Sequence, residues 1–308
     1  MATINAKDVA ELRRQTGCGM MDCKNALVEA EGNFETAIKI LREKGMAATA
    51  KKAGRIAAEG IVAIKTVGDL TAMIEVNSET DFVAKNASFQ EFVDKLLDAI
   101  LANKPASVEA LLACAYDETS TVEATLQEKT YTIGEKLSIR RFVLVEGVVS
   151  TYVHGMGATG VVVKFDVDAA VAATAEFKEF AKNIALQIAA YNVPYLAISD
   201  VPASVVEEEK GIILTQMKQD PKMANKPEKV LEGIVAGKIK KYYETNCVLE
   251  QAYVKDDSMT VSQYVASVAK ALGTSISVVS FVRYEKGEGI EKREDDLAAE
   301  VAKMVGGN

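Results

Sequence analysis

The sequence predicts an α+β protein of several domains, built around a duplicated unit of two strands and one helix. Residues 59–92 and 146–180 match one another across a shift of about 87 residues. In both copies, the alternating apolar pattern of strands gives way to apolar residues at helical spacing. A purely helical pattern precedes the copies, and a pair of helical patterns follows them. Together these observations predict a core with helices on one side of antiparallel sheets.

Residues 1–45 are expected to form a small domain of three short helices. Asn5 and Asn33 can cap the first and third helices, the run 16–19 separates the first from the second, and Gly45 is expected to end the third. So few large apolar residues make a very small core, and the domain is therefore expected to lean on a partner. The residues at helical spacing are Val9, Leu12, Cys23, Ala26, Leu27, Phe34, Ala37, Ile38 and Leu41.

Residues 46–58 are expected to link this domain to the duplicated core. The run from Met46 to Arg55 is rich in Ala and Lys, which favour helix. No apolar stripe anchors it, so it is expected to be a semi-rigid connector rather than a packed element.

Each copy of the duplicated unit predicts a hairpin followed by a helix. The turns are expected at 68–69 and 155–157, where glycines lie between apolar strands. A hairpin with one helix cannot bury both of its faces alone, so the copies are expected to pack as a pseudo-symmetric pair. The first subdomain is expected to span 59–140, and the second 141–200 with 247–284.

The second subdomain is expected to carry a helical hairpin as an insertion at 201–246. Apolar helical stretches at 203–219 and 227–246 flank a polar breaker run. A helix capped by Ser258 or Thr260 and a last strand at 277–284 should follow. The C-terminal module, 285–308, ends in an amphipathic helical segment with Leu297, Val301 and Met304.

Composition argues against several classes of function. The net charge of −8 and the pI near 5.1 disfavour nucleic-acid and anionic-membrane binding, although residues 1–55 carry a local net charge of +3. Cys18 and Cys23 have no second pair and the chain has one histidine, so a tetrahedral zinc site is not expected. Free thiols and the lack of a leader or spanning segment favour a cytoplasmic protein.

Catalytic chemistry is poorly supported by the sequence. It contains no glycine-rich phosphate loop, nucleophile elbow or metal-ligand cluster. The sole imidazole, His154, lies at a predicted turn with no carboxylate assigned to orient it. Neither a cofactor nor a resident metal is expected.

One loop breaks the match between the two copies. Residues 78–86 of the first copy include Thr80-Asp81-Phe82-Val83, where the second copy has Asp168-Ala169-Ala170-Val171. Thr80 or Asp81 could merely cap the next helix while Phe82 turns inward. Alternatively, because the second copy has alanine in place of Phe82, the aromatic side chain serves to enter the surface of a partner.

Three stretches resemble the signature sequences of the bacterial elongation factor Ts family, namely 16–27, 75–85 and 281–291. These motifs are highly specific, and the likeness runs from the helical N-terminus through the doubled core to the tail. Cys18 stands where the family often has a small residue such as alanine. The helical hairpin and the tail vary between members, and the resemblance allows a homodimer within a heterotetramer.

The resemblance implies a guanine-nucleotide exchange factor with no covalent chemistry of its own. Its partner would be elongation factor Tu, a GTPase that holds GDP and Mg2+ tightly. The N-terminal domain is similar to ubiquitin-associated three-helix modules and would dock on the nucleotide-binding domain of the partner. The residues implied for docking are Arg13, Met20 and Met21, with His154 and Gly155 as further contacts.

The same resemblance implies that the mismatched loop dislodges the Mg2+ ion of the partner. Asp81 and Phe82, flanked by Thr80 and Val83, would push between helices near the ion and loosen the phosphate-binding loop. The rival interpretation is a ubiquitin-associated-type binding or scaffold protein, and behind it an enzyme of unrecognised type. A dominant GTPase partner that is displaced by GDP with Mg2+ would decide for exchange.

Overall fold

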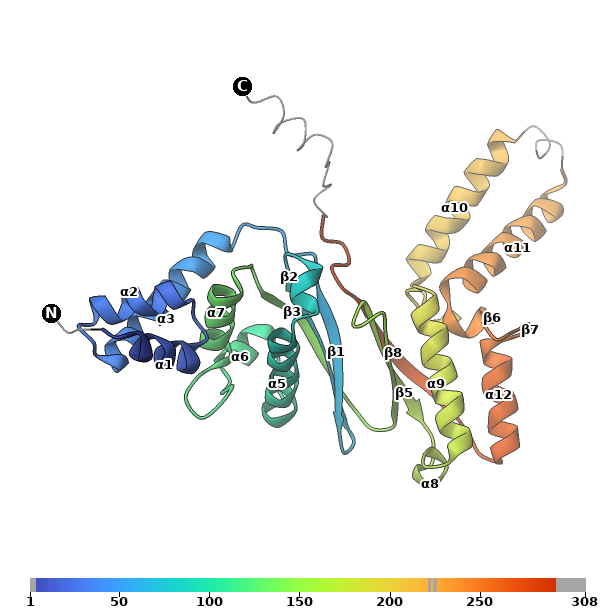
Figure 1. Cartoon of the computed structure of the whole chain (residues 1–308). Helices are drawn as coiled ribbons and strands as arrows, with labels where there is room; N and C mark the ends of the chain where they lie inside the picture. Colours follow the sequence, from blue (N-terminus) through green and yellow to red (C-terminus); the bar gives the residue numbers. More distant parts are fainter. Residues whose placement is uncertain (1–3, 221–222, 224–225, 292–308) are drawn as a thin grey trace. The chain divides into compact units, whose positions relative to one another are not determined.

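The computed structural model describes residues 4–220, 223 and 226–291 of the 308-residue chain (Figure 1). These residues divide into two compact units. The first unit holds residues 4–144, 155–159 and 284–291, and the second holds 145–154 and the described part of 160–283. Both combine helices with small sheets, which confirms the predicted α+β class.

The first unit begins with three helices, α1 (Ala6–Thr16), α2 (Met20–Glu29) and α3 (Phe34–Lys52). Asn5 caps α1 in a capping box with Asp8, and Asn33 caps α3 through the N–H of Thr36. Both predicted caps are therefore confirmed. The apolar residues that the helical spacing selected form one cluster, in which Leu12, Cys23, Ala26, Leu27 and Ala37 are fully buried.

The prediction that Gly45 ends the third helix is wrong. Helix α3 continues to Lys52 and packs against α7 (Val122–Ile133). Gly45 faces the backbone of Gln127, and the ammonium of Lys52 donates to the carbonyl of Thr130 at 3.1 Å. One glycine disfavours helix only by about 1 kcal/mol, which tertiary packing readily exceeds. Residues 46–52 are thus part of a packed helix, not a connector.

The first sheet has the strand order β1-β2-β3. Strands β1 (Glu59–Val67) and β2 (Leu70–Ser78) form the expected antiparallel hairpin, with Glu59 opposite Ser78. Strand β3 (Ser138–Glu146) adds to β2, and α5 (Ala87–Asn103) packs on the hairpin (Figure 1). The sequence did not indicate β3, α6 (Val108–Ala113) or α7.

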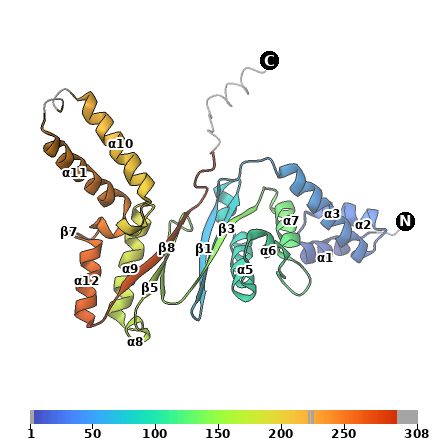
Figure 2. The same ribbon diagram turned by 180° about the vertical axis from the view of Figure 1, so that it is seen from behind.

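The second unit carries the second copy of the repeat. Its sheet has the order β4-β5-β8, from β4 (Val149–His154), β5 (Thr159–Asp166) and β8 (Ser277–Glu285). Short helix α8 (Ala169–Ala172) precedes α9 (Ala175–Ala190), which lies beside α12 (Val261–Leu272) (Figure 2). Thr260 caps α12, as one of the two expected candidates. The second unit also contains four short elements, which are η1 (Ile198–Asp200), η2 (Val248–Glu250), β6 (Ala252–Tyr253) and β7 (Asp256–Thr260).

The expected helical hairpin is present in the second unit as α10 (Ala203–Gln219) and α11 (Glu228–Asn246). Three residues with helical spacing, Ile213, Met217 and Ile239, are buried between the two helices. The predicted amphipathic segment with Leu297, Val301 and Met304 lies outside the described residues.

A buried carboxylate fastens the segment after β8 to the first sheet. Glu75 on β2 is fully buried and accepts hydrogen bonds from Arg140 at 3.1 Å and Arg141 at 2.6 Å. It also accepts from the amide of Asn77 and from the backbone N–H of Gly287 at 2.8 Å. This network therefore joins β2 and β3 to the segment that follows β8.

Two glycines permit close backbone contacts within the first unit. Gly287 has φ +68°, and a Cβ there would lie 2.1 Å from the carbonyl oxygen of Ala58. Gly157 has φ +91°, its carbonyl accepts from the N–H of Val62, and a Cβ would lie 2.9 Å from Ile61. Only glycine meets both demands, of conformation and of space.

Candidate functional site

The β2–α5 loop, residues 78–86, contains the residues that break the repeat. Its middle forms the four-residue helix α4 (Asp81–Ala84). Val83 and Ala84 are buried in the core cluster of the first unit, whereas the Phe82 side chain is 78 % exposed. The interpretation in which Phe82 turns inward is therefore wrong. A phenylalanine ring that is 78 % exposed contributes little to this core, and its apolar area is available to a partner.

The two ends of the β2–α5 loop are held by hydrogen bonds. The hydroxyl and the N–H of Thr80 both donate to the carboxylate of Glu135, at 2.6 Å and 2.9 Å. Ser78 donates to the carbonyl of Thr80, and Asn86 caps α5 through the N–H of Ser88. The loop is therefore a fixed support for the exposed Phe82.

A negative charge stands next to Phe82. Asp81 is half-exposed, and Lys85 donates to its carboxylate at 2.6 Å. That hydrogen bond lowers the pKa of Asp81, so the carboxylate is ionised at neutral pH. The Lys85 ammonium also lies 5.9 Å from the centroid of the Phe82 ring. The loop thus presents an ion pair, Asp81 with Lys85, beside an apolar ring.

A cleft of about 560 Å³ connects the β2–α5 loop with the end of α1. Phe82 and Val83 line it together with the run from Gln15 to Gly17 and with residues of α7. Arg13, exposed one turn earlier on α1, accepts the N–H of Gly17 at its carbonyl oxygen. The structure therefore brings the loop and the end of α1 to the same cleft.

The exposed face of α2 is apolar at its start. Met20 and Met21 are its first two residues, with exposed fractions of 48 % and 63 %. Val28, two turns along the helix, is also exposed, although the sequence reasoning did not name it. The exposure of Val28 could have been predicted, because helical spacing places it outside the buried stripe of Cys23, Ala26 and Leu27.

The remaining two expected contact residues lie at the β4–β5 turn. His154 ends β4, is exposed, and its Nδ1 is 3.0 Å from the hydroxyl of Tyr152. Gly155 follows in the left-handed conformation. The next residue, Met156, was missed; its side chain is 80 % exposed at a φ of +53°. Its exposure could have been predicted, because Met156 lies between two glycines in a predicted turn.

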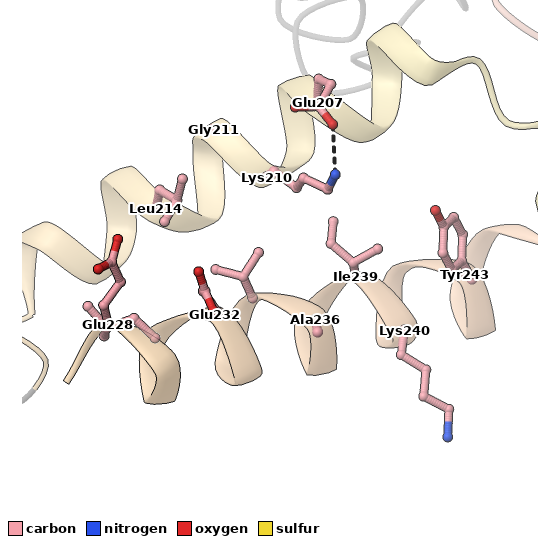
Figure 3. A pocket seen from close by; sticks show the side chains of 12 residues that line it. Glu207, Lys210, Gly211, Leu214, Glu228, Glu232, Ala236, Ile239, Lys240 and Tyr243 are labelled. Atoms are coloured by element: carbon pink, nitrogen blue, oxygen red, sulfur yellow. Dashed lines mark hydrogen bonds and ion pairs between the residues drawn. The ribbon is translucent and has the colours of Figure 1, made fainter. Parts of the chain in front are cut away.

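A second concave surface lies on the helical hairpin. A groove of about 900 Å³ runs between α10 and α11, and it is lined by Leu214 from α10 and Ile239 from α11 (Figure 3). Lys210 pairs with Glu207 at its rim at 2.7 Å. None of the residues expected from the sequence to have a functional role lies in this groove.

The sequence of this chain matches a known protein family. A family model described as elongation factor TS matches residues 79–288, from the β2–α5 loop to the segment after β8. The chain belongs to the elongation factor Ts family.

Relatives in the elongation factor Ts family extend the match over the N-terminal helices. An elongation factor Ts from Syntrophotalea carbinolica is 46 % identical over 98 % of this chain and 99 % of its own length. One from Clostridioides difficile is 46 % identical over 99 % of this chain and all of its own length, and one from Clostridium kluyveri is 45 % identical. Family membership assigns the chain to translation elongation in protein biosynthesis.

Two other kinds of site are absent from the part of the chain that the structure describes. Within residues 4–220, 223 and 226–291, no three or more His, Cys, Asp or Glu side chains are grouped to hold a metal ion. In the same part of the chain, none of the helices has both the length and the apolar character needed to cross a bilayer.

Proposed function

We propose that this chain is a guanine-nucleotide exchange factor that binds GDP-bound elongation factor Tu and promotes release of the GDP. The observation that carries the proposal is the exposed Phe82 on a loop whose ends are fixed. Family membership supplies the class of partner. The activity is proposed for the cytoplasm, with no direct contact to nucleic acid or membrane.

Docking is assigned to the three-helix domain, residues 1–45. Arg13, Met20 and Met21 present a cation and two flexible thioethers that can adapt to the nucleotide-binding domain of the GTPase. His154 and Gly155 at the β4–β5 turn add a contact from the second repeat. Separate contact surfaces let binding free energy accumulate without one deep pocket.

The β2–α5 loop is proposed to disturb the Mg2+ site of the GTPase. Asp81 and Phe82 would push between helices of the partner near the ion, with Thr80 and Val83 flanking them on the loop. Movement of the ion weakens its hold on the phosphates of GDP. No bond is made or broken, so the chain needs no catalytic group of its own.

Reciprocal coupling is sufficient for exchange. The factor and GDP weaken the binding of one another by the same ratio when both are on the GTPase. Burial of one phenylalanine contributes about 1.5–3 kcal/mol, or one to two decades of affinity. Phe82 alone is too little to displace a tightly held nucleotide, so the docking domain and the core must contribute the rest.

The test is release of a fluorescent GDP analogue from elongation factor Tu in a stopped-flow instrument. The intact chain should accelerate release in a saturable way, and excess GDP with Mg2+ should dissociate the complex. A chain that binds ubiquitin, or binds the GTPase without changing GDP release, would contradict the proposal. The mass of the complex in solution tests the homodimer within a heterotetramer, which stays a prediction.

A further inference from the structure

Residues 134–136, in the turn between α7 and β3, form hydrogen bonds with the start of the β2–α5 loop. Each carboxylate oxygen of Glu135 takes one hydrogen bond from Thr80, with the hydroxyl at 2.6 Å and the N–H at 2.9 Å. A hydroxyl bound this closely to a carboxylate makes a charge-assisted hydrogen bond, which is stronger than a neutral one. Glu135 therefore fixes both the backbone and the side chain of Thr80.

The β2–α5 loop also accepts a hydrogen bond from the turn, and both segments contact the chain that follows α3. Glu79 accepts the backbone N–H of Lys136 at 2.6 Å and pairs with Arg55 at 3.2 Å. The ammonium of Lys136 donates to the carbonyls of Ala53 and Arg55 at 2.7 Å and 2.8 Å. Three separate segments of the first unit thus meet immediately before Phe82.

Thr80 is used differently from an ordinary cap. It occupies the N-cap position of α4, yet its side chain makes no hydrogen bond to the N–H groups of that helix. In the second copy, Asp168 does cap α8, through the N–H of Ala170. A four-residue helix has little stability of its own, so its direction depends on contacts outside it. The hydrogen bonds from Thr80 to Glu135 fix its first end, and the burial of Val83 and Ala84 fixes its other end.

We propose that Glu135 is a positioning residue, which acts through Thr80 to keep Phe82 directed outward before the partner arrives. The inference rests on the proposed function, because Glu135 would act only through the loop that the proposed function uses and would have no chemistry of its own. A loop already fixed in its bound conformation loses less entropy on insertion into the partner. Without the hold, Phe82 samples other positions and the coupling to GDP weakens.

The experiment measures GDP release from elongation factor Tu with the full-length Glu135→Ala and Thr80→Val variants. Each should lower the maximal release rate by about three- to tenfold. The concentration for half-maximal effect should change less than about twofold, because the surface of α2 is untouched. Thr80→Ser keeps the hydroxyl and should retain most of the rate. Glu118→Ala, an exposed glutamate elsewhere in the first unit, is the matched control.

A second background separates positioning from general stability. In an Asp81→Ala, Phe82→Ala chain, Glu135→Ala should cause no further loss, because Glu135 acts only through the loop that carries those two side chains. A full additional loss in that background would overturn the inference. So would an unchanged maximal rate in Glu135→Ala and Thr80→Val while Phe82→Ala is impaired.

Failure of the proposed function is recognised separately. In that case the Phe82→Ala variant alone would accelerate GDP release from elongation factor Tu as much as the wild type does. If Glu135→Ala does not fold, Glu135→Gln and Thr80→Val test the same contact. Glu135→Gln retains one acceptor oxygen and should give an intermediate rate, and a wild-type rate in both variants would overturn the inference.

Discussion

At the scale of single residues, Phe82 and Ala170 make an internal comparison. They occupy the same position in α4 and α8, two short helices that precede α5 and α9 in the two repeats. Both positions are exposed, so neither side chain fills a core. The fold thus tolerates alanine here, and the aromatic ring in the first repeat calls for a cause outside the fold.

The buried Glu75 gives a prediction about stability and pH. Burial alone would raise its pKa, but hydrogen bonds from Gly287, Asn77, Arg140 and Arg141 outweigh burial and lower it. A carboxyl whose folded pKa is lowered stabilises the protein above its unfolded pKa of about 4.3, and that stabilisation is lost as pH falls through the folded value.

The Glu75→Gln variant should therefore be destabilised by about 3 kcal/mol at pH 7, because two arginines lose a buried partner. Thermal unfolding followed from pH 7 to pH 3 should show the gap in Tm between wild type and variant closing at the acid end. Glu91→Gln, which breaks only an exposed pair with Lys95, is the control and should change Tm little. A gap that is constant with pH would contradict this assignment.

At the scale of elements, the sequence predicted those with strong periodicity and missed those whose partners are distant. The hairpins, α5, α9, α10 and α11 all followed from apolar spacing. Helix α7 buries Val122 with Thr125 and Thr130, so its inward face is largely polar in the sequence. Strand β3 carries Arg140 and Arg141, which are satisfied by Glu75 some 65 residues away. Such contacts have no local signature.

The same reasoning applies to the β2–α5 loop. The sequence singled out this loop because the second repeat shows which residues the scaffold does not need. The role of Glu135 was not predictable, since Thr80 and Glu135 are 55 residues apart. The packing of α3 on α7 was missed as well, because Gly45 suggested an end to the helix. Deletion of residues 1–54 would remove this packed helix, so point variants test docking more cleanly.

The exposed start of α2 gives a prediction at this scale. Met20→Ala with Met21→Ala should raise the concentration for half-maximal GDP release about tenfold, equivalent to about 1.4 kcal/mol of lost binding. The maximal rate should be unchanged, because the methionines contribute to docking and not to the displacement of Mg2+. Val230→Ala, an exposed apolar residue on α11, is the control. A lower maximal rate with normal half-saturation would contradict the docking role.

At the scale of the whole molecule, the chain presents several separate surfaces that differ in their chemistry. The three-helix domain has exposed thioethers, the β2–α5 loop has an aromatic ring beside the Asp81–Lys85 ion pair, and the β4–β5 turn has His154 and Met156. No one of these is worth enough free energy to release a tightly bound nucleotide. In the proposed function, their combination on one chain would supply the negative coupling to GDP.

The central claim is that the β2–α5 loop drives release of GDP, and the double variant Asp81→Ala, Phe82→Ala tests it most directly. Both side chains are exposed or half-exposed, so Tm should change by no more than about 2 °C. At saturating factor, stopped-flow release of a fluorescent GDP analogue should slow at least about tenfold, or about 1.4 kcal/mol of lost coupling. A release rate equal to that of the wild type, or a variant that unfolds, would contradict the account.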